Sequence, residues 1–355
     1  MRKVTALLLA AAMVIGLSAC GKKEEPAATK GAETKSETKA QTETKAAEGE
    51  ESEAKEEKAG DYRVLIGCSN MSGSFYSWLS NTCKKSLEGL GIEASIVDLK
   101  SDSANVPSLI EMAVSGGYNG LVIDKPDHEQ DTDTLLKEAA EAGVYTVLVN
   151  NTAGDDGVSC YVGLDNYTLG YCIGTAASKV IPEGAKGLIL KATAGNTGSE
   201  DRYNGWMDAM KEAGRDDIEI LDTKNSKDWS KEGAMAVMED WTQIYTEFDF
   251  VYSLCDDMVC GCIEVCDAAN FDTQKIQFFG IDGLANGCNA VKAGTMTATV
   301  LQNADDMGKV TAETLLEMMS GKDTSSRKFA LEGTVITSDN VDEIIAMHEE
   351  NGMMQ

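Results

Sequence analysis

The residues of this chain that are most able to do chemistry are crowded into the stretch CDDMVCGCIEVC, residues 255–266. Four cysteines at such spacing can bind a metal ion or form a redox centre when they are deprotonated. Two carboxylates, Asp256 and Asp257, follow the first cysteine and can be pictured as an acid–base pair. In a folded core, the same cysteines would act as small apolar side chains. The elements around the stretch decide between these interpretations.

Most of the stretch has the pattern of a helix over 257–268, preceded by a strand that ends at Cys255. The spacing predicts one apolar stripe that packs on a sheet, made of Met258, Val259, Cys262, Ile263 and Cys266. Cys260 lies off this stripe, and Asp257 falls in the first helical turn, where negative charge is favoured. Four thiolates cannot meet on one metal across roughly 16 Å of helix. A partial site at Cys262 and Cys266 stays open, although no histidine is near to complete it.

An enzymatic function is not supported by the remaining motifs. The two histidines are His128 and His348, and neither stands in a triad context. His348 lies near the C-terminus, where we expect the chain to fray. The segment GKDTSS at 321–326 follows a helix and lacks the first glycine of a P-loop. We therefore predict no enzyme, no catalytic residue, no metal and no cofactor.

Short β-branched runs alternate with helix-period segments of about 10–15 residues from Tyr62 onward, which is typical of βαβ units. The predicted strands are 63–69, 93–99, 120–124, 146–151, 161–165, 187–192, 218–224, 250–255, 276–282 and 297–302. The clearest helical segments are 75–90, 132–142, 169–180, 200–213, 231–244, 257–268 and 304–319. Glycine often follows a predicted helix, as at Gly143 and Gly214, where it suits a C-terminal cap.

About ten strands over nearly 300 residues suit an α/β fold of two doubly wound parallel-sheet lobes joined by a hinge. We expect the chain to cross between the lobes near 164–166 and again near 302–304. Ligands of open parallel sheets sit beyond the carboxyl ends of the strands. The polar residues at those ends are Ser69, Asn70, Asp124, Asn150, Asn151, Asp165, Cys255, Asp282 and Gln302.

The N-terminus has the pattern of an export signal, with Arg2 and Lys3 before an apolar run that is shorter than the ~20 residues of a membrane span. Its ending, LSAC, resembles a bacterial lipobox, which implies lipidation of Cys20; an ordinary signal peptide is the alternative. Residues 21–60 contain no large apolar side chain, so we expect a solvated tether, with a spacer helix as the alternative. Nine cysteines remain after Cys20, an odd number that does not predict a disulfide framework. The formal net charge of −28 argues against nucleic acid as a partner.

Seven segments in order resemble motifs of the type I periplasmic binding proteins of the ribose- and galactose-binding group, over nearly all of 62–335. They are RVLIGCSNMSGSFYSWL, GYNGLVIDKPD, AGVYTVLVNN, YVGLDNYTLG, ATAGNTGSEDRYNGW, FFGIDG and MTATVLQNADDMG. The resemblance implies a ligand site between the lobes. Phe75 and Tyr76 would stack on one face of a sugar ring and Trp229 on the other. Hydroxyls would be bound by Asn150, Asn151, Arg202, Asp282 and Gln302, with Ser69 and Gly73 nearby.

Four residues depart from the ribose-binding pattern: Asn150-Asn151 replaces Asp-Arg, and Cys255 and Asp124 stand where asparagine is common. A different pentose, a hexose, a deoxysugar or a polyol would suit such a pocket. The resemblance implies a monomeric, extracytoplasmic lipoprotein that delivers a sugar or polyol to the permease subunits of an ABC importer. A nucleoside- or signal-binding lipoprotein is the alternative. The predicted domains are a signal peptide (1–20), a tether (21–60), an N-terminal lobe (61–164 with 303–331) and a C-terminal lobe (165–302 with 332–355).

Overall fold

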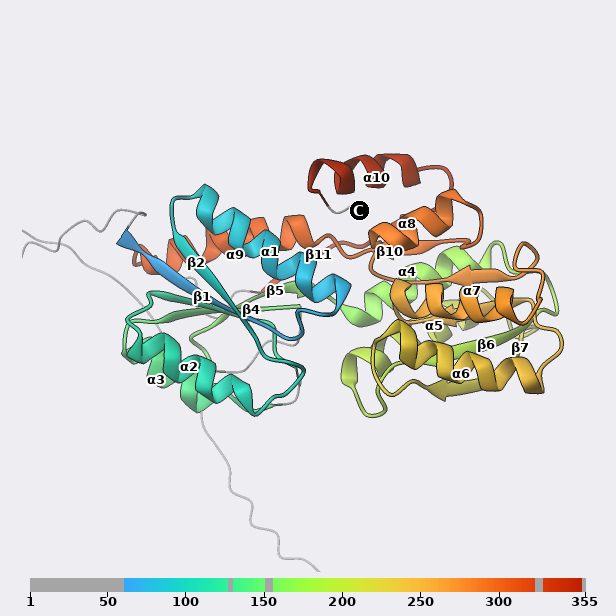
Figure 1. Ribbon diagram of the computed structural model, residues 1–355, viewed down its shortest axis with the longest axis horizontal. Coiled ribbons are helices and arrows are strands. Elements are labelled where there is room, and N and C mark those ends of the chain that lie inside the picture. The colour runs from blue at the N-terminus through green and yellow to red at the C-terminus, as the bar shows by residue number, and fades with distance from the viewer. Residues whose placement is uncertain (1–60, 127–129, 151–155, 323–327, 353–355) are drawn as a thin grey trace, which may run out of the picture. The chain divides into compact units, whose positions relative to one another are not determined.

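The fold is built on two separate sheets of parallel strands, as a computed structural model of residues 61–126, 130–150, 156–322 and 328–352 describes (Figure 1). The first sheet has six strands in the order β11-β5-β4-β3-β1-β2, and all of its neighbouring strands are parallel. We call this sheet and its helices the first lobe. Its elements are β1 (Arg63–Cys68), α1 (Ser74–Gly89), β2 (Glu93–Asp98), α2 (Asn105–Ser115), β3 (Gly120–Ile123), α3 (Asp133–Glu141), β4 (Tyr145–Val149), β5 (Cys160–Leu164), α9 (Ala304–Met319) and β11 (Lys328–Leu331).

The second sheet has four parallel strands in the order β7-β6-β8-β9, and a two-stranded antiparallel ladder of β10 and β12 adjoins it. We call these strands and their helices the second lobe. Its elements are α4 (Asn166–Ser178), β6 (Lys186–Lys191), α5 (Thr197–Glu212), β7 (Glu219–Asn225), α6 (Lys231–Ile244), β8 (Phe250–Ser253), α7 (Asp256–Ala268), β9 (Gln277–Phe279), α8 (Ala285–Lys292), β10 (Thr299–Leu301), β12 (Thr334–Ile336) and α10 (Val341–Glu350).

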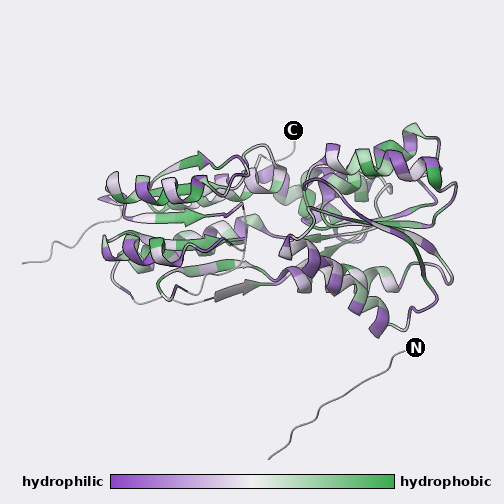
Figure 2. Ribbon diagram, turned by 90° about the horizontal axis from the view of Figure 1, so that it is seen from below, coloured by the Kyte–Doolittle hydropathy of each residue, from purple (hydrophilic) through white to green (hydrophobic). Residues whose placement is uncertain are grey.

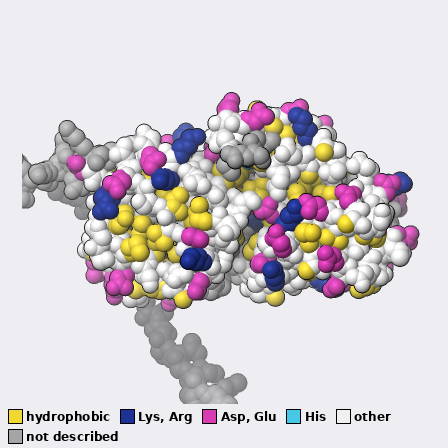
Figure 3. All heavy atoms as spheres, in the orientation of Figure 1, with side chains coloured by type: hydrophobic (Ala, Val, Ile, Leu, Met, Phe, Trp, Pro, Cys, Tyr) yellow, Lys and Arg dark blue, Asp and Glu magenta, His cyan; other side chains and the backbone are white. Residues whose placement is uncertain are grey.

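Continuous burial along the central strands explains why the sheets are parallel. Every residue of β3 is buried, and so are five of the six residues of β1. A strand that is buried on both faces needs helices on both sides, which βαβ crossovers supply. Figure 2 shows the same distribution, with hydrophobic residues concentrated on the strands and on the inward faces of the helices. Figure 3 shows acidic and basic side chains interspersed over the face in view.

The predicted α/β fold is confirmed, and all ten predicted strands are present with ends within three residues of the prediction. Gly143 and Gly214 have φ of 86° and 70°, as glycines that follow a helix in the left-handed conformation do. The predicted segments did not include α2, α8, α10, β11 or β12. The eight residues of α8, ANGCNAVK, contain glycine and asparagine, which are weak helix formers. Among the described residues, no helix combines the length and apolar character that crossing a bilayer requires.

The chain passes from one sheet to the other after β5, after β10 and between β11 and β12. The first two passages fall where the sequence places crossings, at 164–166 and 302–304. The predicted boundaries of the two lobes, 61–164 with 303–331 and 165–302 with 332–355, stay a prediction.

Helices α4 and α5 approach each other unusually closely, and this contact sets the position of Arg202. A Cβ atom on Gly170 would lie 2.0 Å from the backbone oxygen of Arg202, and one on Gly205 would lie 2.1 Å from the oxygen of Tyr167. Only glycine lets two helix backbones come this near. Arg202 is therefore presented from a helix that has little freedom to shift.

Replacing Gly205 with alanine should separate α4 from α5 and destabilise the protein by about 1–3 kcal/mol, the usual scale for overpacking. Gly89, at the exposed end of α1, gives the matched control, because a Cβ atom added there would meet no heavy atom within 4 Å. G89A should be neutral or stabilising by up to about 1 kcal/mol. Urea unfolding measures both free energies, and equal stability of the two variants would contradict the close approach.

Candidate functional site

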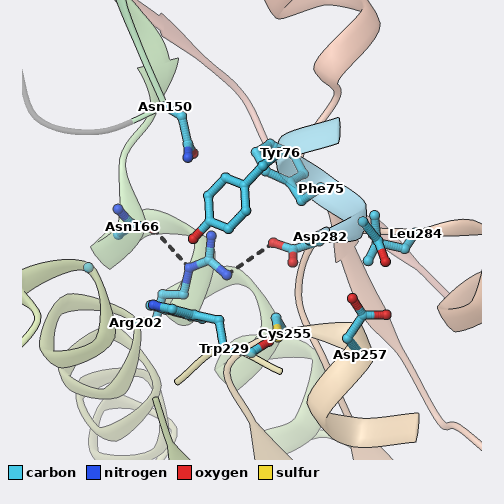
Figure 4. A pocket seen from close by; sticks show the side chains of 13 residues that line it. Phe75, Tyr76, Asn150, Asn166, Arg202, Trp229, Cys255, Asp257, Asp282 and Leu284 are labelled. Atoms are coloured by element: carbon cyan, nitrogen blue, oxygen red, sulfur yellow. Dashed lines mark hydrogen bonds and ion pairs between the residues drawn. The ribbon is translucent and has the colours of Figure 1, made fainter. Parts of the chain in front are cut away.

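A pocket opens where the two lobes face each other, and both lobes line it (Figure 4). The space inside it that is open to the centre of a water molecule is about 60 Å³. One water needs roughly 10–15 Å³ on this measure, so the pocket suits a small ligand. Its lining residues are Gly73, Ser74, Phe75, Tyr76, Asn150, Asn166, Gly198, Arg202, Trp229, Cys255, Asp257, Asp282 and Leu284.

The lining side chains come from the carboxyl ends of strands and from the helices that follow them. Asn150 directly follows β4, and Asp282 lies three residues after β9. Cys255 is the N-cap of α7, and Asn166 is the first residue of α4. This is the edge where open parallel sheets bind ligands.

Arg202 is the centre of the polar contacts in the pocket. Its side chain is 7% exposed, and its Nη1 lies 3.0 Å from Asp282 Oδ1. Nη1 also donates to the backbone oxygen of Leu254 at 2.6 Å, Nη2 donates to Gln302 Oε1 at 2.8 Å and Nε donates to Asn166 Oδ1 at 2.8 Å. A buried guanidinium needs such partners because an unpaired buried charge is strongly unfavourable.

The contacts of Arg202 continue into the first lobe through amide side chains. Gln302 Nε2 donates to Asn150 Oδ1 at 2.7 Å, and Asn150 Nδ2 donates to Asp124 Oδ1 at 3.3 Å. A chain of buried polar groups thus runs from Asp282 through Arg202, Gln302 and Asn150 to Asp124. Since Gln302 follows β10, at a passage between the lobes, it joins the polar groups of both.

Burial changes the acidity of several of these groups. It raises the pKa of Asp282 to about 6, although the Arg202 guanidinium acts in the opposite direction. It raises the pKa of Asp124 to about 8, against the hydrogen bond from Asn150. It also raises the pKa of the Tyr76 hydroxyl and that of the Cys255 thiol, so both stay protonated at neutral pH.

The aromatic side chains enter the pocket from opposite lobes. Phe75 and Tyr76 lie at the start of α1, with ring centroids 6.3 Å apart in an edge arrangement. Trp229 belongs to the second lobe, and its ring centre lies 5.3 Å from the Arg202 guanidinium carbon. In Figure 4, Tyr76 and Trp229 lie on different sides of the Arg202 side chain. Flat apolar surfaces are therefore available from both lobes.

Seven of the predicted site residues line the pocket: Phe75, Tyr76, Asn150, Arg202, Trp229, Cys255 and Asp282. Ser69, Asp124 and Gln302 are buried but do not line it, and Asp124 and Gln302 lie behind Asn150 instead. The predictions for Asn151 and Cys20 fall outside the described residues.

Sequence reasoning missed five lining residues of the pocket: Ser74, Asn166, Gly198, Asp257 and Leu284. Asn166 belongs to the segment YVGLDNYTLG of the family resemblance, and this motif could have identified it as a pocket residue. Asp257 is a first-turn residue of α7, as its position in the sequence predicts, but it also lines the pocket. Leu284 follows the FFGIDG segment, and nothing in its own type points to a ligand.

The cysteine-rich stretch divides between core and pocket, as predicted. Met258, Val259, Cys262, Ile263 and Cys266 are buried, and Cys260 is less so. Cys255 Sγ donates to the backbone oxygen of Trp229 at 3.5 Å. Within the described ranges, no disulfide joins two cysteines, and no group of three or more potential ligands is placed to hold a metal.

The neighbouring carboxylates Asp256 and Asp257 do not act on a common site. Asp256 is fully buried and accepts hydrogen bonds from Thr299 Oγ1 at 2.6 Å and from the Leu284 backbone NH at 2.8 Å. Burial raises its pKa well above the ordinary range. Asp257 faces the pocket and accepts from Asn286 Nδ2 at 2.7 Å. The hydrogen bonds of Asp256 therefore connect α7 to β10 and to the start of α8. Asp256 and Asp257 do not form an acid–base pair.

Comparison with known proteins agrees with this geometry. A family model described as a periplasmic binding protein domain matches residues 65–323. A ribose import binding protein of Bacillus subtilis is 24% identical over 262 residues, which cover 74% of this chain and 83% of the relative.

Two solved structures show the same fold. A solute-binding protein of Actinobacillus succinogenes with bound D-allose has a TM-score of 0.74 and 17% identity, covering 79% of this chain and 99% of the other. A myo-inositol binding protein of Caulobacter has a TM-score of 0.73 and 23% identity, covering 81% of this chain and 97% of the other. These three relatives are binding proteins, in agreement with the prediction that the chain is not an enzyme.

The raised pKa of Asp124 gives a testable pH dependence. Since the folded state holds this proton more tightly than the unfolded state, the group's contribution to stability is present at about pH 4 and is lost as the pH rises through about 8. D124N cannot ionise, so its free energy of unfolding should rise relative to wild type from pH 5 to pH 8, by at most about 1.4 kcal/mol per pH unit. Urea unfolding measures it, with D240N at an exposed position as control. The same pH dependence in D124N and wild type would contradict the assignment.

Proposed function

The chain belongs to the type I periplasmic binding proteins of the ribose-binding group, and we propose that it captures one small neutral sugar or polyol between its lobes. In this proposal it acts as a monomer and delivers the ligand to the permease subunits of an ABC importer. The family is one of solute-binding proteins that serve such transporters. The ligand class and the delivery step are the parts that we propose.

The observation that carries the proposal is the buried Arg202–Asp282 pair between aromatic rings of opposite lobes. Asp282 accepts from Arg202 through Oδ1, which leaves Oδ2 for a ligand hydroxyl. Asn166 accepts through its oxygen, so its NH₂ group remains as a donor. Sugar rings have apolar C–H faces that pack on aromatic rings and hydroxyls that need such partners.

The charge of the pocket favours a neutral ligand. The positive charge of Arg202 is paired with Asp282 inside the pocket, and a further carboxylate, Asp257, lies in the lining. These carboxylates would repel an anionic ligand, and the described lining residues include no second cation to offset the repulsion. Sugar acids and phosphorylated sugars are therefore unfavourable.

Cys255 narrows the choice of ligand further. Its thiol donates to the Trp229 backbone oxygen, so the sulfur presents a weak acceptor to the pocket. A ligand hydroxyl directed at this position would gain little. We infer a ligand that places a ring face, a deoxy carbon or a differently oriented hydroxyl beside Cys255; ribose itself does not follow from these contacts.

The proposed mechanism is hinge closure. Each lobe supplies part of the pocket, so a ligand makes its full set of contacts only when the lobes are together. Ligand binding shifts the population toward that arrangement by the free energy of those extra contacts. The importer would then recognise the closed lobes.

We further propose that the protein is extracytoplasmic and held to the membrane by lipid on Cys20, with residues 21–60 as tether. The support is the LSAC motif and the lack of large apolar residues in 21–60. Two or more acyl chains would anchor it stably. C20S expressed in a bacterium should leave the membrane fraction while the wild type stays in it. An unchanged distribution between fractions would contradict the anchor.

Thermal shift with D-ribose, D-allose, myo-inositol and adenosine tests the ligand class. At least one sugar or polyol should raise the melting temperature, and D282N should weaken its binding by about 2–4 kcal/mol in calorimetry, because a buried partner is lost. D240N, exposed on α6, should bind like wild type. A shift with adenosine alone would favour the nucleoside alternative, and unaltered affinity in D282N would contradict the site.

A further inference from the structure

His348 occupies a buried position between the lobes, and not a frayed chain end as the sequence suggests. It lies in α10, the C-terminal helix, and is 0% exposed. Its Nε2 lies 2.8 Å from the backbone oxygen of Gly283, in the second lobe. Its ring makes an edge contact with Trp78 in α1 of the first lobe, with centroids 4.9 Å apart.

The chemistry of the Gly283 contact fixes the role of the imidazole. A carbonyl oxygen can only accept, so Nε2 carries the proton and donates it. Nδ1 is buried and makes no hydrogen bond to any described residue. His348 therefore acts through one N–H donor and one ring contact.

The carbonyl that His348 holds belongs to a strained segment that carries the pocket carboxylate. The backbone of Asp282 has φ of 111°, a value that residues other than glycine rarely adopt. Gly283 follows with φ of 65°, and a Cβ there would lie 2.8 Å from the Cα of Leu301. Cys288 Sγ also donates to the Gly283 oxygen, at 3.5 Å. Such strain persists only where the surroundings hold it, and His348 is one of the groups that do so.

The ring of His348 contacts the helix that carries Phe75 and Tyr76. Trp78 lies one turn after Phe75 in α1, with ring centroids 6.2 Å apart. Trp78 Nε1 donates to Asp305 Oδ1 in α9 at 3.3 Å. One histidine thus contacts both the segment that presents Asp282 and the helix that presents Phe75 and Tyr76.

A second contact connects the end of α10 to the first lobe. Asn351 Nδ2 donates to Asp305 Oδ2 at 2.6 Å, and Lys85 Nζ donates to Asn351 Oδ1 at 3.2 Å. The helix itself is held on the second lobe, where Ile345 is buried and Asp342 pairs with Lys292 of α8 at 3.0 Å. Figure 1 shows α10 beside α8.

We propose that α10 is an interlobe clasp in which His348 positions the Asp282–Gly283 segment and, with Asn351, holds the lobes together outside the pocket. The clasp rests on the proposed hinge closure but involves no ligand atom. Its contacts favour the arrangement in which both lobes line the pocket, so they increase the apparent affinity for any ligand that needs this arrangement. His348 is a positioning residue, because it acts on the ligand through Asp282 and α1.

Dissociation rates measured by stopped-flow tryptophan fluorescence test the clasp, with D-ribose, D-allose and myo-inositol as probes. H348L and N351A should each release the bound probe about five- to tenfold faster, the scale of one hydrogen bond. H348Q keeps an N–H donor and should recover part of the loss. E349Q, exposed on the same helix, is the control. Release at the wild-type rate from both H348L and N351A would overturn the clasp.

The experiment also covers an H348L variant that does not fold and a wild type that binds none of the probes. If H348L does not fold, N351A decides, because Asn351 is only partly buried. If none of the three probes binds the wild type, these three compounds are excluded as ligands while the clasp is still tested. Small-angle X-ray scattering of the ligand-free proteins then decides: a larger radius of gyration in an H348L/N351A double variant supports the clasp, and an equal radius overturns it.

Discussion

The burial of the Arg202 guanidinium is the constraint on which the rest of the site depends. A buried cation is tolerated only when its N–H groups are satisfied and its charge is paired. Its partners come from four segments: Asn166 at the start of α4, Leu254 after β8, Asp282 after β9 and Gln302 after β10. These partners come together because the fold gathers the ends of several strands and the helices after them at one edge, so the architecture of the lobes also builds the pocket.

The same constraint links the pocket to the hinge. Gln302 accepts from Arg202 and donates to Asn150, so the chain that passes between the lobes is part of the polar network. Asp124, at the far end, has a pKa raised to about 8 and adds little negative charge at neutral pH. The network therefore carries one balanced ion pair and otherwise neutral groups, which is compatible with a neutral ligand that completes the remaining hydrogen bonds.

Much of the fold and part of the site follow from the sequence, for different reasons. The strands are predicted because β-branched runs are local signals. Arg202 and Asp282 are predicted because each lies in a motif of the family resemblance, Arg202 early in a helix and Asp282 after a strand. Asp124 is predicted as a ligand contact, but it lies behind Asn150 and does not line the pocket, since a strand-end position does not say which polar group lies nearest the pocket. His348 was missed because its burial depends on contacts with Gly283 and Trp78, which lie far away in sequence.

The most direct measurement of the central claim is native mass spectrometry of the protein purified without added ligand from the bacterium that produces it, followed by release and identification of what is bound. The account predicts a single species heavier than the apoprotein by the mass of one uncharged monosaccharide or polyol. That mass should disappear in R202A, if the variant is folded, because the buried ion pair is lost. A nucleoside, a charged metabolite, or the same bound sugar in the folded R202A variant would contradict it.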